Sequence, residues 1–257
     1  MPSGKLTVYK AALHLGAVRQ GGSGAQLYKV NDRNETYIVK LKGNSQGIRV
    51  LYNEYVSGRL GEVIGVPFGE HVLVEVDALL HPRDGEPNVP RREPGIQFGT
   101  LYYPFAQTDI IQLRMARNYR EFPSVVVFDT LIARGNGRQY AVYPSSGEAD
   151  EVKDKGCIYD QGFAFTGSPI WSQASLQAEA DCKVKDDLGL KQSFSDVGLY
   201  EKYIDTVEAL PRRELDAIVH EAPLEEWGVA VQEANALAEW LDRRRMLLRK
   251  AVEAYLR

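Results

Sequence analysis

Cysteine is scarce in this sequence, and long apolar runs are missing from it. Only Cys157 and Cys182 occur among the 257 residues, which is too few for the disulfide framework of a small secreted domain. The four histidines show no paired spacing of the kind that binds zinc. No stretch approaches the roughly 18 apolar residues that a membrane-spanning helix needs, and residues 1–5 lack the apolar core of a signal peptide. We therefore expect a reduced, cytoplasmic protein with no membrane partner.

An excess of positive charge is missing as well. The formal net charge is -4, so the sequence disfavours a broad basic surface of the kind that binds nucleic acid. Its 44% hydrophobic and 26% charged residues are ordinary for a globular protein, and we find no internal repeat. The length fits either one two-lobed domain or two small domains. The order of the predicted elements has to decide between these.

The first hundred residues are predicted to be mostly strand, with one helix. Apolar positions recur at three- and four-residue steps over residues 49–64, which predicts an amphipathic helix ending near Gly65, before Pro67. Four prolines and many charges predict an exposed loop at 82–94. Strands are expected at 6–9, 36–41, 71–79 and 97–105.

The remaining residues are predicted to be mostly helical. Helices are expected at 110–118 and 124–133, followed by a small hairpin with strands at 139–143 and 156–159. From about residue 199 the pattern is almost wholly helical, with Pro211 and Pro223 in first turns and a last helix at 240–256. This order predicts an α+β fold of two lobes, an N-lobe of residues 1–105 and a C-lobe of residues 106–257, with a cleft between them.

Phosphoryl transfer is one chemistry that such a cleft can house. It needs a cover for the phosphates, a lysine to neutralise them, oxygen ligands for magnesium and an aspartate to receive the substrate proton. The run GGSG at 21–24 lies between two early strands, and glycines let backbone N–H groups approach anionic oxygens closely. A flexible hairpin turn is the alternative interpretation of the same run.

A lysine and a glutamate follow in the order that kinases use. Lys40 lies in an alternating apolar strand, on one face with Ile38, and Glu54 lies in the middle of the following helix. Such a pair aligns phosphates in protein kinases. Alternatively, each is a solvated side chain on an exposed surface.

Asp160 ends the apolar run CIYD, and Gly162 follows two residues later. A carboxylate at the end of a rigid strand suits a magnesium ligand. The alternative is an Asx-turn that closes the hairpin.

Taken in order, these segments resemble the short bacterial HipA-like kinases. The resemblance runs from about residue 5 to residue 230 and rests on the order and spacing of its motifs. They are YIVK at 37–40, RVLYNEYV at 49–56, GEVIGVP at 61–67, FP at 122–123, VFDTLI at 127–132, YDQGFAF at 159–165, and a tail at 213–227 that ends in APLEEW.

The resemblance implies a two-lobed protein-kinase-like fold that uses ATP and magnesium to phosphorylate proteins on serine or threonine. It implies that Lys40 contacts the phosphates, that Glu54 orients Lys40, and that Asp160 holds magnesium. The strand at 97–105 would form the hinge beside adenine. The further nucleotide-binding residues would be Gly22, Ser23 and Gly24 over the phosphates, and Tyr102 and Tyr103 near adenine. A protein substrate or a regulatory protein partner is left open.

The catalytic loop departs from the family. The family's loop resembles N-x-D-R-H-x-x-N, whereas this chain has ARGNGRQYA at 133–141. Asn136 takes the place of the catalytic base and Ala141 that of a metal-binding asparagine. A positioned base contributes about 10²–10⁴ in rate. Asp129, on the preceding helix, is expected to bond the loop backbone as a structural residue. We therefore expect ATP and magnesium binding with weak or absent phosphotransferase activity; the alternatives are an active atypical serine/threonine or small-molecule kinase, and an interaction module that binds no nucleotide.

Overall fold

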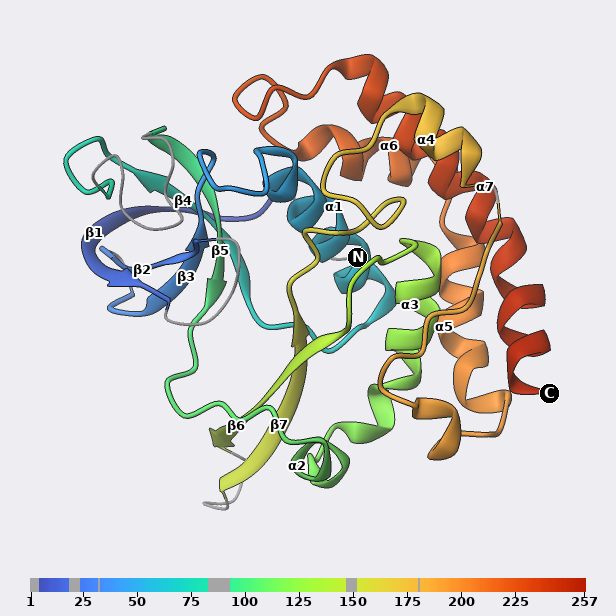
Figure 1. Cartoon of the computed structure of the whole chain (residues 1–257). Helices are drawn as coiled ribbons and strands as arrows, with labels where there is room; N and C mark the ends of the chain where they lie inside the picture. The colour runs from blue at the N-terminus through green and yellow to red at the C-terminus, as the bar shows by residue number, and fades with distance from the viewer. Residues whose placement is uncertain (1–4, 19–23, 32, 83–92, 147–151, 180) are drawn as a thin grey trace.

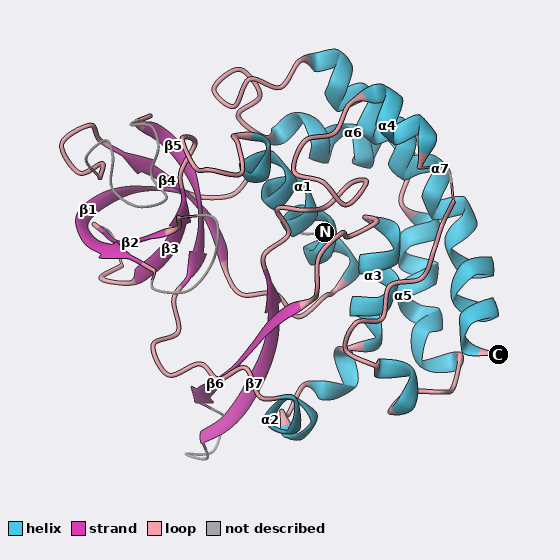
Figure 2. Ribbon diagram, viewed as in Figure 1, coloured by secondary structure: helices cyan, strands magenta, loops and turns pink. Residues whose placement is uncertain are grey.

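The chain folds into a strand-rich part and a helical part, which lie at the left and right of Figure 1. The computed structural model describes residues 5–18, 24–31, 33–82, 93–146, 152–179 and 181–257. In Figure 2 a hairpin of two strands projects downward from the helical part, beneath the strand-rich part. This is the predicted α+β arrangement. The loop predicted at 82–94 falls largely on residues outside the described part.

Five strands of the strand-rich part close into a barrel in the order β1-β2-β3-β5-β4. The pairing of β1 with β4 is parallel and the others are antiparallel. Closure leaves no free sheet edge, and alternate residues, among them Tyr28, Tyr37 and Val39, fill the inside. The strands are β1 (Val8–Ala17), β2 (Gln26–Val30), β3 (Thr36–Lys40), β4 (His71–Val76) and β5 (Gly95–Leu101).

Strands β4 and β5 end several residues earlier than the sequence predicted. β4 stops at Val76 because the Asp77 carboxylate accepts a bond from the backbone N of Leu79, which turns the chain. β5 stops at Leu101 because Pro104 has no N–H to continue the ladder, and Tyr102 N makes the last cross-chain bond. Strand β2 was not predicted, because its five residues directly follow the glycine run.

Helix α1 (Arg49–Ile64) has the predicted bounds. Gly65 ends it in the left-handed conformation, at φ +80°, and its N–H caps carbonyls of the last turn. The helix lies between the barrel and the helical part (Figure 1), so 13 of its 16 residues are buried. Gly61 makes that close packing possible, since a Cβ there would lie 1.7 Å from Phe68 Cε2.

The helical part is built around α3, α5 and α7, whose apolar faces pack together. Its elements are α2 (Ile110–Met115), η1 (Tyr119–Glu121), α3 (Pro123–Leu131), β6 (Gln139–Ser146), β7 (Val152–Tyr159), α4 (Gln173–Ala178), η2 (Leu190–Gln192), α5 (Gly198–Ala209), α6 (Arg212–Glu221) and α7 (Val231–Leu256).

Three helix starts were predicted wrongly. Pro211 is the cap of α6 and lies one residue before its first turn. Pro223 begins a turn rather than a helix, because Trp227 N bonds Pro223 O for one turn only and Gly228, at φ +61°, then reverses the chain. The last helix also starts earlier than expected, at Val231.

The two parts are joined by contacts from the loop and helices near the C-terminus. Glu226 accepts bonds from Lys42 Nζ at 2.9 Å and from Ile96 N at 2.6 Å. Trp227 Nε1 donates to Ile96 O at 2.9 Å, and Tyr52 Oη of α1 donates to Val219 O of α6 at 3.0 Å. The barrel and α1 are therefore held against the helical part.

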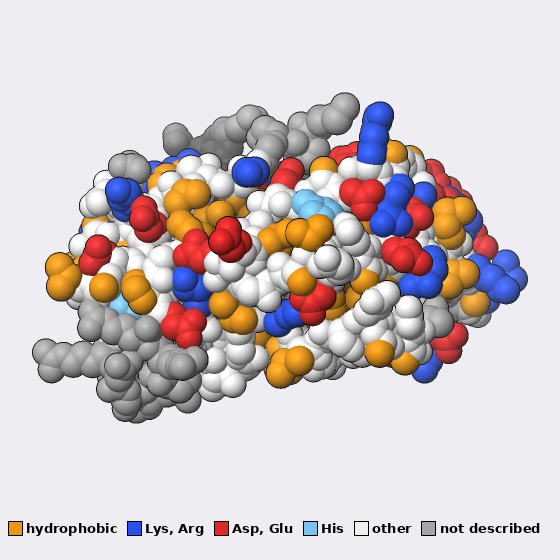
Figure 3. Space-filling model, turned by 90° about the horizontal axis from the view of Figure 1, so that it is seen from above, with side chains coloured by type: hydrophobic (Ala, Val, Ile, Leu, Met, Phe, Trp, Pro, Cys, Tyr) orange, Lys and Arg blue, Asp and Glu red, His pale blue; other side chains and the backbone are white. Residues whose placement is uncertain are grey.

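The face shown in Figure 3 mixes acidic and basic side chains. On α7, Arg249 Nη2 pairs with Asp205 at 2.5 Å and with Glu208 at 2.8 Å, which neutralises its charge locally. None of the helices in the described part is long and apolar enough to span a membrane.

Candidate functional site

Lys40, Glu54 and Asp160 meet where the barrel, α1 and the hairpin come together. Lys40 is the last residue of β3, and its Nζ lies 2.5 Å from Glu54 Oε1 and 2.5 Å from Asp160 Oδ1. The Lys40 and Glu54 side chains are buried, whereas the Asp160 side chain keeps 23% of its surface exposed. Segments 120 residues apart in sequence thus supply one ion-paired cluster.

The cluster keeps Lys40 charged although it is buried. Burial alone would lower the pKa of Lys40, but the carboxylates of Glu54 and Asp160 outweigh burial and raise this pKa. Burial is the largest single influence on the pKa of Asp160 and raises it, but the charge of Lys40 and the hydrogen bonds of the carboxylate together lower it more, so the net shift of that pKa is downward. Asp160 is therefore an ionised carboxylate at neutral pH, with part of its surface open to a ligand.

The backbone around Asp160 explains why the carboxylate points to Lys40. Asp160 adopts the left-handed conformation, at φ +63°, and the next amide, Gln161 N, donates to Glu54 Oε2 at 2.9 Å. A Cβ at Gly162 would lie 2.8 Å from Val50 Cγ1 of α1, so glycine is needed for this approach. Helix α1 therefore helps to shape the turn at Asp160.

Asn53 is a further residue of this region that sequence reasoning did not single out. Its Nδ2 donates to Gly162 O at 2.8 Å, and its Oδ1 accepts from Trp171 Nε1 at 2.8 Å. The side chain is fully buried. Its position beside Glu54 in the motif at 49–56 was the feature of the sequence that could have pointed to it.

The loop at 133–138 lacks a carboxylate of its own, as the sequence indicated. Asn136 Oδ1 is buried without a hydrogen-bond partner among the described residues. Ala141 lies on β6 opposite Cys157 of β7 and is 8% exposed. An amide cannot accept a proton as a carboxylate does, and a methyl group offers no metal ligand.

Asp129 holds this loop in a different way from the one predicted. We expected its carboxylate to bond the loop backbone, but it pairs with two loop guanidinium groups. Arg134 Nε lies 3.1 Å from Asp129 Oδ2, and Arg138 Nε donates to the same oxygen at 2.9 Å. Arg138 Nη2 also bonds Asp129 Oδ1. The prediction failed because nothing in the sequence showed that the two arginines turn inward.

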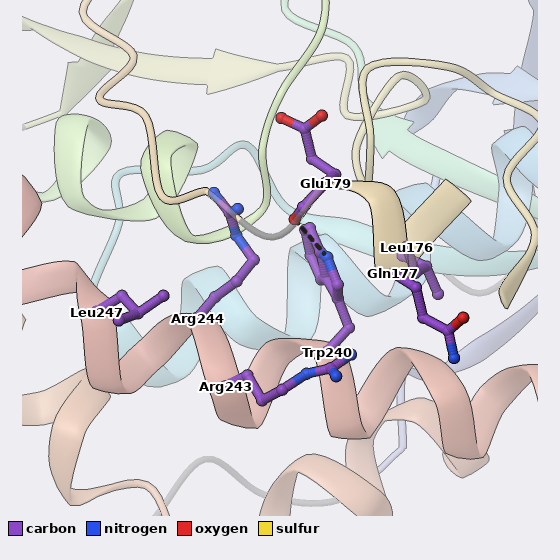
Figure 4. A pocket seen from close by; sticks show the side chains of 7 residues that line it. All are labelled: Leu176, Gln177, Glu179, Trp240, Arg243, Arg244 and Leu247. Carbon is purple, nitrogen blue, oxygen red and sulfur yellow. Dashed lines mark hydrogen bonds between the residues drawn. The ribbon is translucent and has the colours of Figure 1, made fainter. Parts of the chain in front are cut away.

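Arg244 of α7 supports the start of the same loop. Its Nε donates to Leu131 O at 2.8 Å and its Nη2 to Thr130 O at 2.5 Å, the carbonyls at the end of α3. The guanidinium stacks over Trp240, with Arg244 Cζ 4.6 Å from the ring centroid. Figure 4 shows both side chains beside a pocket between α4 and α7, and none of the predicted site residues lines that pocket.

The residues predicted to lie near adenine follow β5. Tyr102 N donates to Thr36 O at 2.9 Å. The Tyr103 ring stacks on Tyr143 of β6, with centroids 3.7 Å apart and planes 13° apart, and burial raises the pKa of Tyr103. Tyr103 thus joins the end of the barrel to the hairpin.

The glycine-rich run follows β1 and precedes β2 in sequence, and these two strands pair antiparallel. Gly24 is at φ +61°, and its carbonyl accepts a bond from Gln26 Nε2 at 2.9 Å. Gly22 and Ser23 lie outside the described residues. Their predicted place over the phosphates stays a prediction.

The side chains present fit one kind of metal site only. No group of three or more His, Cys, Asp or Glu side chains is placed to hold a metal ion within the part of the chain that the structure describes. Mg²⁺ commonly binds through one or two carboxylates together with substrate phosphates. Asp160 fits that role, whereas Ala141 cannot help to hold a second ion.

Comparison with known proteins places these features in a context. A family model described as HipA-like kinase matches residues 15–255, and so includes the last helix as well. The crystal structure of a Helicobacter pylori proinflammatory kinase, CtkA, is similar, with a TM-score of 0.59 and 11% sequence identity. The match covers 98% of this chain and 97% of that one, which confirms the predicted kinase-like fold. No match was found among curated proteins.

Proposed function

The chain belongs to the HipA-like kinase family, and from this premise we propose that it binds ATP with Mg²⁺ but transfers the phosphoryl group slowly or not at all. It would then act as a regulatory, pseudokinase-like protein with a nucleotide ligand and a protein partner. The N-lobe would be residues 1–105 and the C-lobe residues 106–257. The chain would lie in the cytoplasm, a reducing compartment in which the free thiols of buried Cys157 and half-buried Cys182 would stay reduced.

The observation that carries this proposal is the bridge from Lys40 Nζ to both Glu54 and Asp160, at 2.5 Å each. Catalysis of phosphoryl transfer is mostly positioning and charge neutralisation. Lys40 would neutralise the phosphates, Glu54 would hold Lys40 in place, and Asp160 would hold one Mg²⁺ that arrives with the nucleotide. Magnesium, when bound, supplies further positive charge at the phosphate oxygens.

The loop supports the second half of the proposal. Asn136 stands where a base is required, and Asp129 is committed to Arg134 and Arg138. Asp187 is the other acidic side chain bonded to this loop in the described part, through Arg138 N at 3.2 Å and Arg134 Nη2. The missing base alone costs about 10²–10⁴ in rate. Residual slow transfer is the second candidate, because the Lys40 cluster is assembled.

A thermal-shift titration with ATP and Mg²⁺ tests the nucleotide site. A ligand that binds only the folded chain adds about 2.7 kcal/mol at a hundredfold excess over Kd, which raises Tm by roughly 5–10 °C for a chain of this size. Asp160→Asn, which preserves the shape of the side chain, should reduce the shift. An unchanged Tm at saturating nucleotide would refute the nucleotide site and favour an interaction module that binds no nucleotide.

Label transfer separates the pseudokinase from an active kinase. ATP labelled at the γ-phosphate is incubated with the purified chain alone and with cell lysate. We expect no label on protein above the level given by Asp160→Ala. Transfer that is lost in this control would show real catalysis and establish an active atypical kinase.

A further inference from the structure

The loop without a base still touches the metal-binding turn, through one guanidinium group. We propose that Arg138 is a positioning residue: it holds the turn on both sides of Asp160, so that the carboxylate is ready for nucleotide-bound Mg²⁺. The inference rests on the proposed function and assigns a task to the degenerate loop. That loop would serve the nucleotide site rather than the transfer step.

Arg138 contacts the two residues that flank Asp160. Its Nη1 donates to Gln161 Oε1 at 2.8 Å and reaches Tyr159 O at 3.3 Å. The Gln161 side chain is fully buried, so this hydrogen bond is shielded from water. The guanidinium therefore fixes the backbone immediately before Asp160 and the side chain immediately after it.

Arg138 is itself immobilised and cannot serve as a phosphate ligand. Its side chain is wholly buried, and its Nε and Nη2 are both taken by Asp129 of α3. Its backbone N donates to Asp187. A bidentate arginine–carboxylate pair has a fixed geometry, so α3 determines where the remaining nitrogen, Nη1, can point. Through Arg138, helix α3 therefore holds the turn at a fixed position.

The backbones of the loop and the turn also lie directly against each other. Gly135 N donates to Phe163 O at 3.0 Å, and Phe165 N donates to Ile132 O at 2.7 Å. A Cβ at Gly135 would lie 2.2 Å from Gly167 Cα, which leaves room for no side chain. By contrast, a Cβ at Gly137 would meet nothing within 4 Å.

We call the contacts of Arg138 with Tyr159 and Gln161 the clamp. The turn needs it because the backbone of the turn is strained. Asp160, Phe165 and Thr166 have φ of +63°, +61° and +76°, in the left-handed region that disfavours residues with a Cβ. Such a residue persists only where its surroundings fix it. If the clamp is lost, the segment relaxes and Asp160 moves away from the position beside Lys40.

The test compares ATP affinity with Mg²⁺ and with EDTA, because Asp160 is the metal ligand that the clamp holds. The measured quantity is the ratio of the affinity for ATP with Mg²⁺ to the affinity for ATP with EDTA. This ratio should be well above one in wild type, and Asp160→Asn should bring it close to one. Gln161→Met removes the hydrogen bond to Arg138 while keeping the volume, and should reduce the ratio about tenfold, as expected for a bond to a charged group. Gly135→Ala should reduce it too, whereas the matched Gly137→Ala should leave it unchanged.

The outcomes separate this inference from the proposed function. Folded Gln161→Met and Gly135→Ala variants that keep the wild-type ratio would overturn the role of Arg138 and leave nucleotide binding standing. A lower Tm with an unchanged ratio would show a purely structural contact, which also overturns it. Wild type that binds ATP equally with and without Mg²⁺ refutes both the role of Arg138 and the Mg²⁺ role proposed for Asp160, and leaves only nucleotide binding standing. Wild type that binds neither form refutes both proposals.

Discussion

At the scale of single residues, the site is defined by one lysine between two carboxylates. Placing three charges in a buried cluster is costly unless each is paired, and Lys40 pairs with both neighbours. Lys40, Glu54 and Asp160 could be selected from the sequence because their order matched a kinase-like family. Arg134 and Arg138 could not, since a surface arginine and an inward-facing one have the same local pattern.

Removing the Lys40 charge should destabilise the fold as well as weaken ATP binding. Lys40→Met leaves Glu54 buried without its partner, which typically costs 3–5 kcal/mol. The double variant Lys40→Met/Glu54→Gln should recover a large part of that loss, because the amide carries no charge. Urea unfolding of the three proteins measures this. A double variant no more stable than Lys40→Met would show that the pair is not coupled.

His71 gives a prediction on pH. It lies buried beside Phe68 and Phe98, and burial lowers its pKa from 6.5 to about 4. The unfolded chain therefore takes up this proton at a higher pH than the folded chain. The contribution of neutral His71 to the free energy of unfolding is full above pH 6.5 and is lost as the pH falls towards 4.

From pH 7 to pH 4.5 the free energy of unfolding should therefore fall by about 2 kcal/mol less in His71→Leu than in wild type. Urea unfolding at the two pH values gives the comparison, and groups shared by both proteins cancel in the difference. Parallel losses in the two proteins would contradict the assigned pKa of His71.

At the scale of elements, helix α1 connects sequence and fold most directly. Its spacing of apolar residues and Gly65 predicted both ends correctly. Elements whose ends depend on distant contacts were predicted less well. Helix α2 ends at Met115 rather than near Asn118, because the Asn118 side chain bonds the backbone of Gly156 at 2.8 Å in both directions.

Gly61→Ala in α1 should lower stability although alanine favours helices. The substitution gains about 1 kcal/mol of helix propensity, but the new methyl group would meet the Phe68 ring, and overpacking costs about 1–3 kcal/mol. Thermal unfolding should show a lower Tm. Gly137→Ala adds the same methyl group in open space and should change Tm little. A higher Tm for Gly61→Ala would mean that Phe68 can move aside freely.

At the scale of the whole molecule, α1 links the two parts. It lies among the strands in sequence, but it packs against the helical part as well. Arg49, at its start, pairs with Glu233 of α7, and Trp227 bonds the barrel at Ile96 O. The sequence predicted the order of the two parts. It could not show these bonds, because they join residues 130 or more positions apart.

The two parts should therefore unfold together. Trp171, Trp227 and Trp240 lie in the helical part, and Trp171 and Trp227 also bond α1 and the barrel. Their fluorescence therefore reports on the helical part and on its contact with the rest, whereas far-UV circular dichroism reports on the whole chain. Both signals should change at one urea concentration, as in a two-state transition. Separate midpoints would show that α1 and the loop at 222–229 do not couple the barrel to the helices.

The proposed function places a nucleotide site beside a catalytic loop that lacks its base. Calorimetric titration of the full chain with ATP in excess Mg²⁺ tests it most directly. We expect saturable one-to-one binding that Asp160→Asn weakens and that Asn136→Asp leaves intact, since Asn136 lies outside the nucleotide-binding cluster. The absence of binding heat at millimolar nucleotide, together with an unchanged Tm, would contradict it.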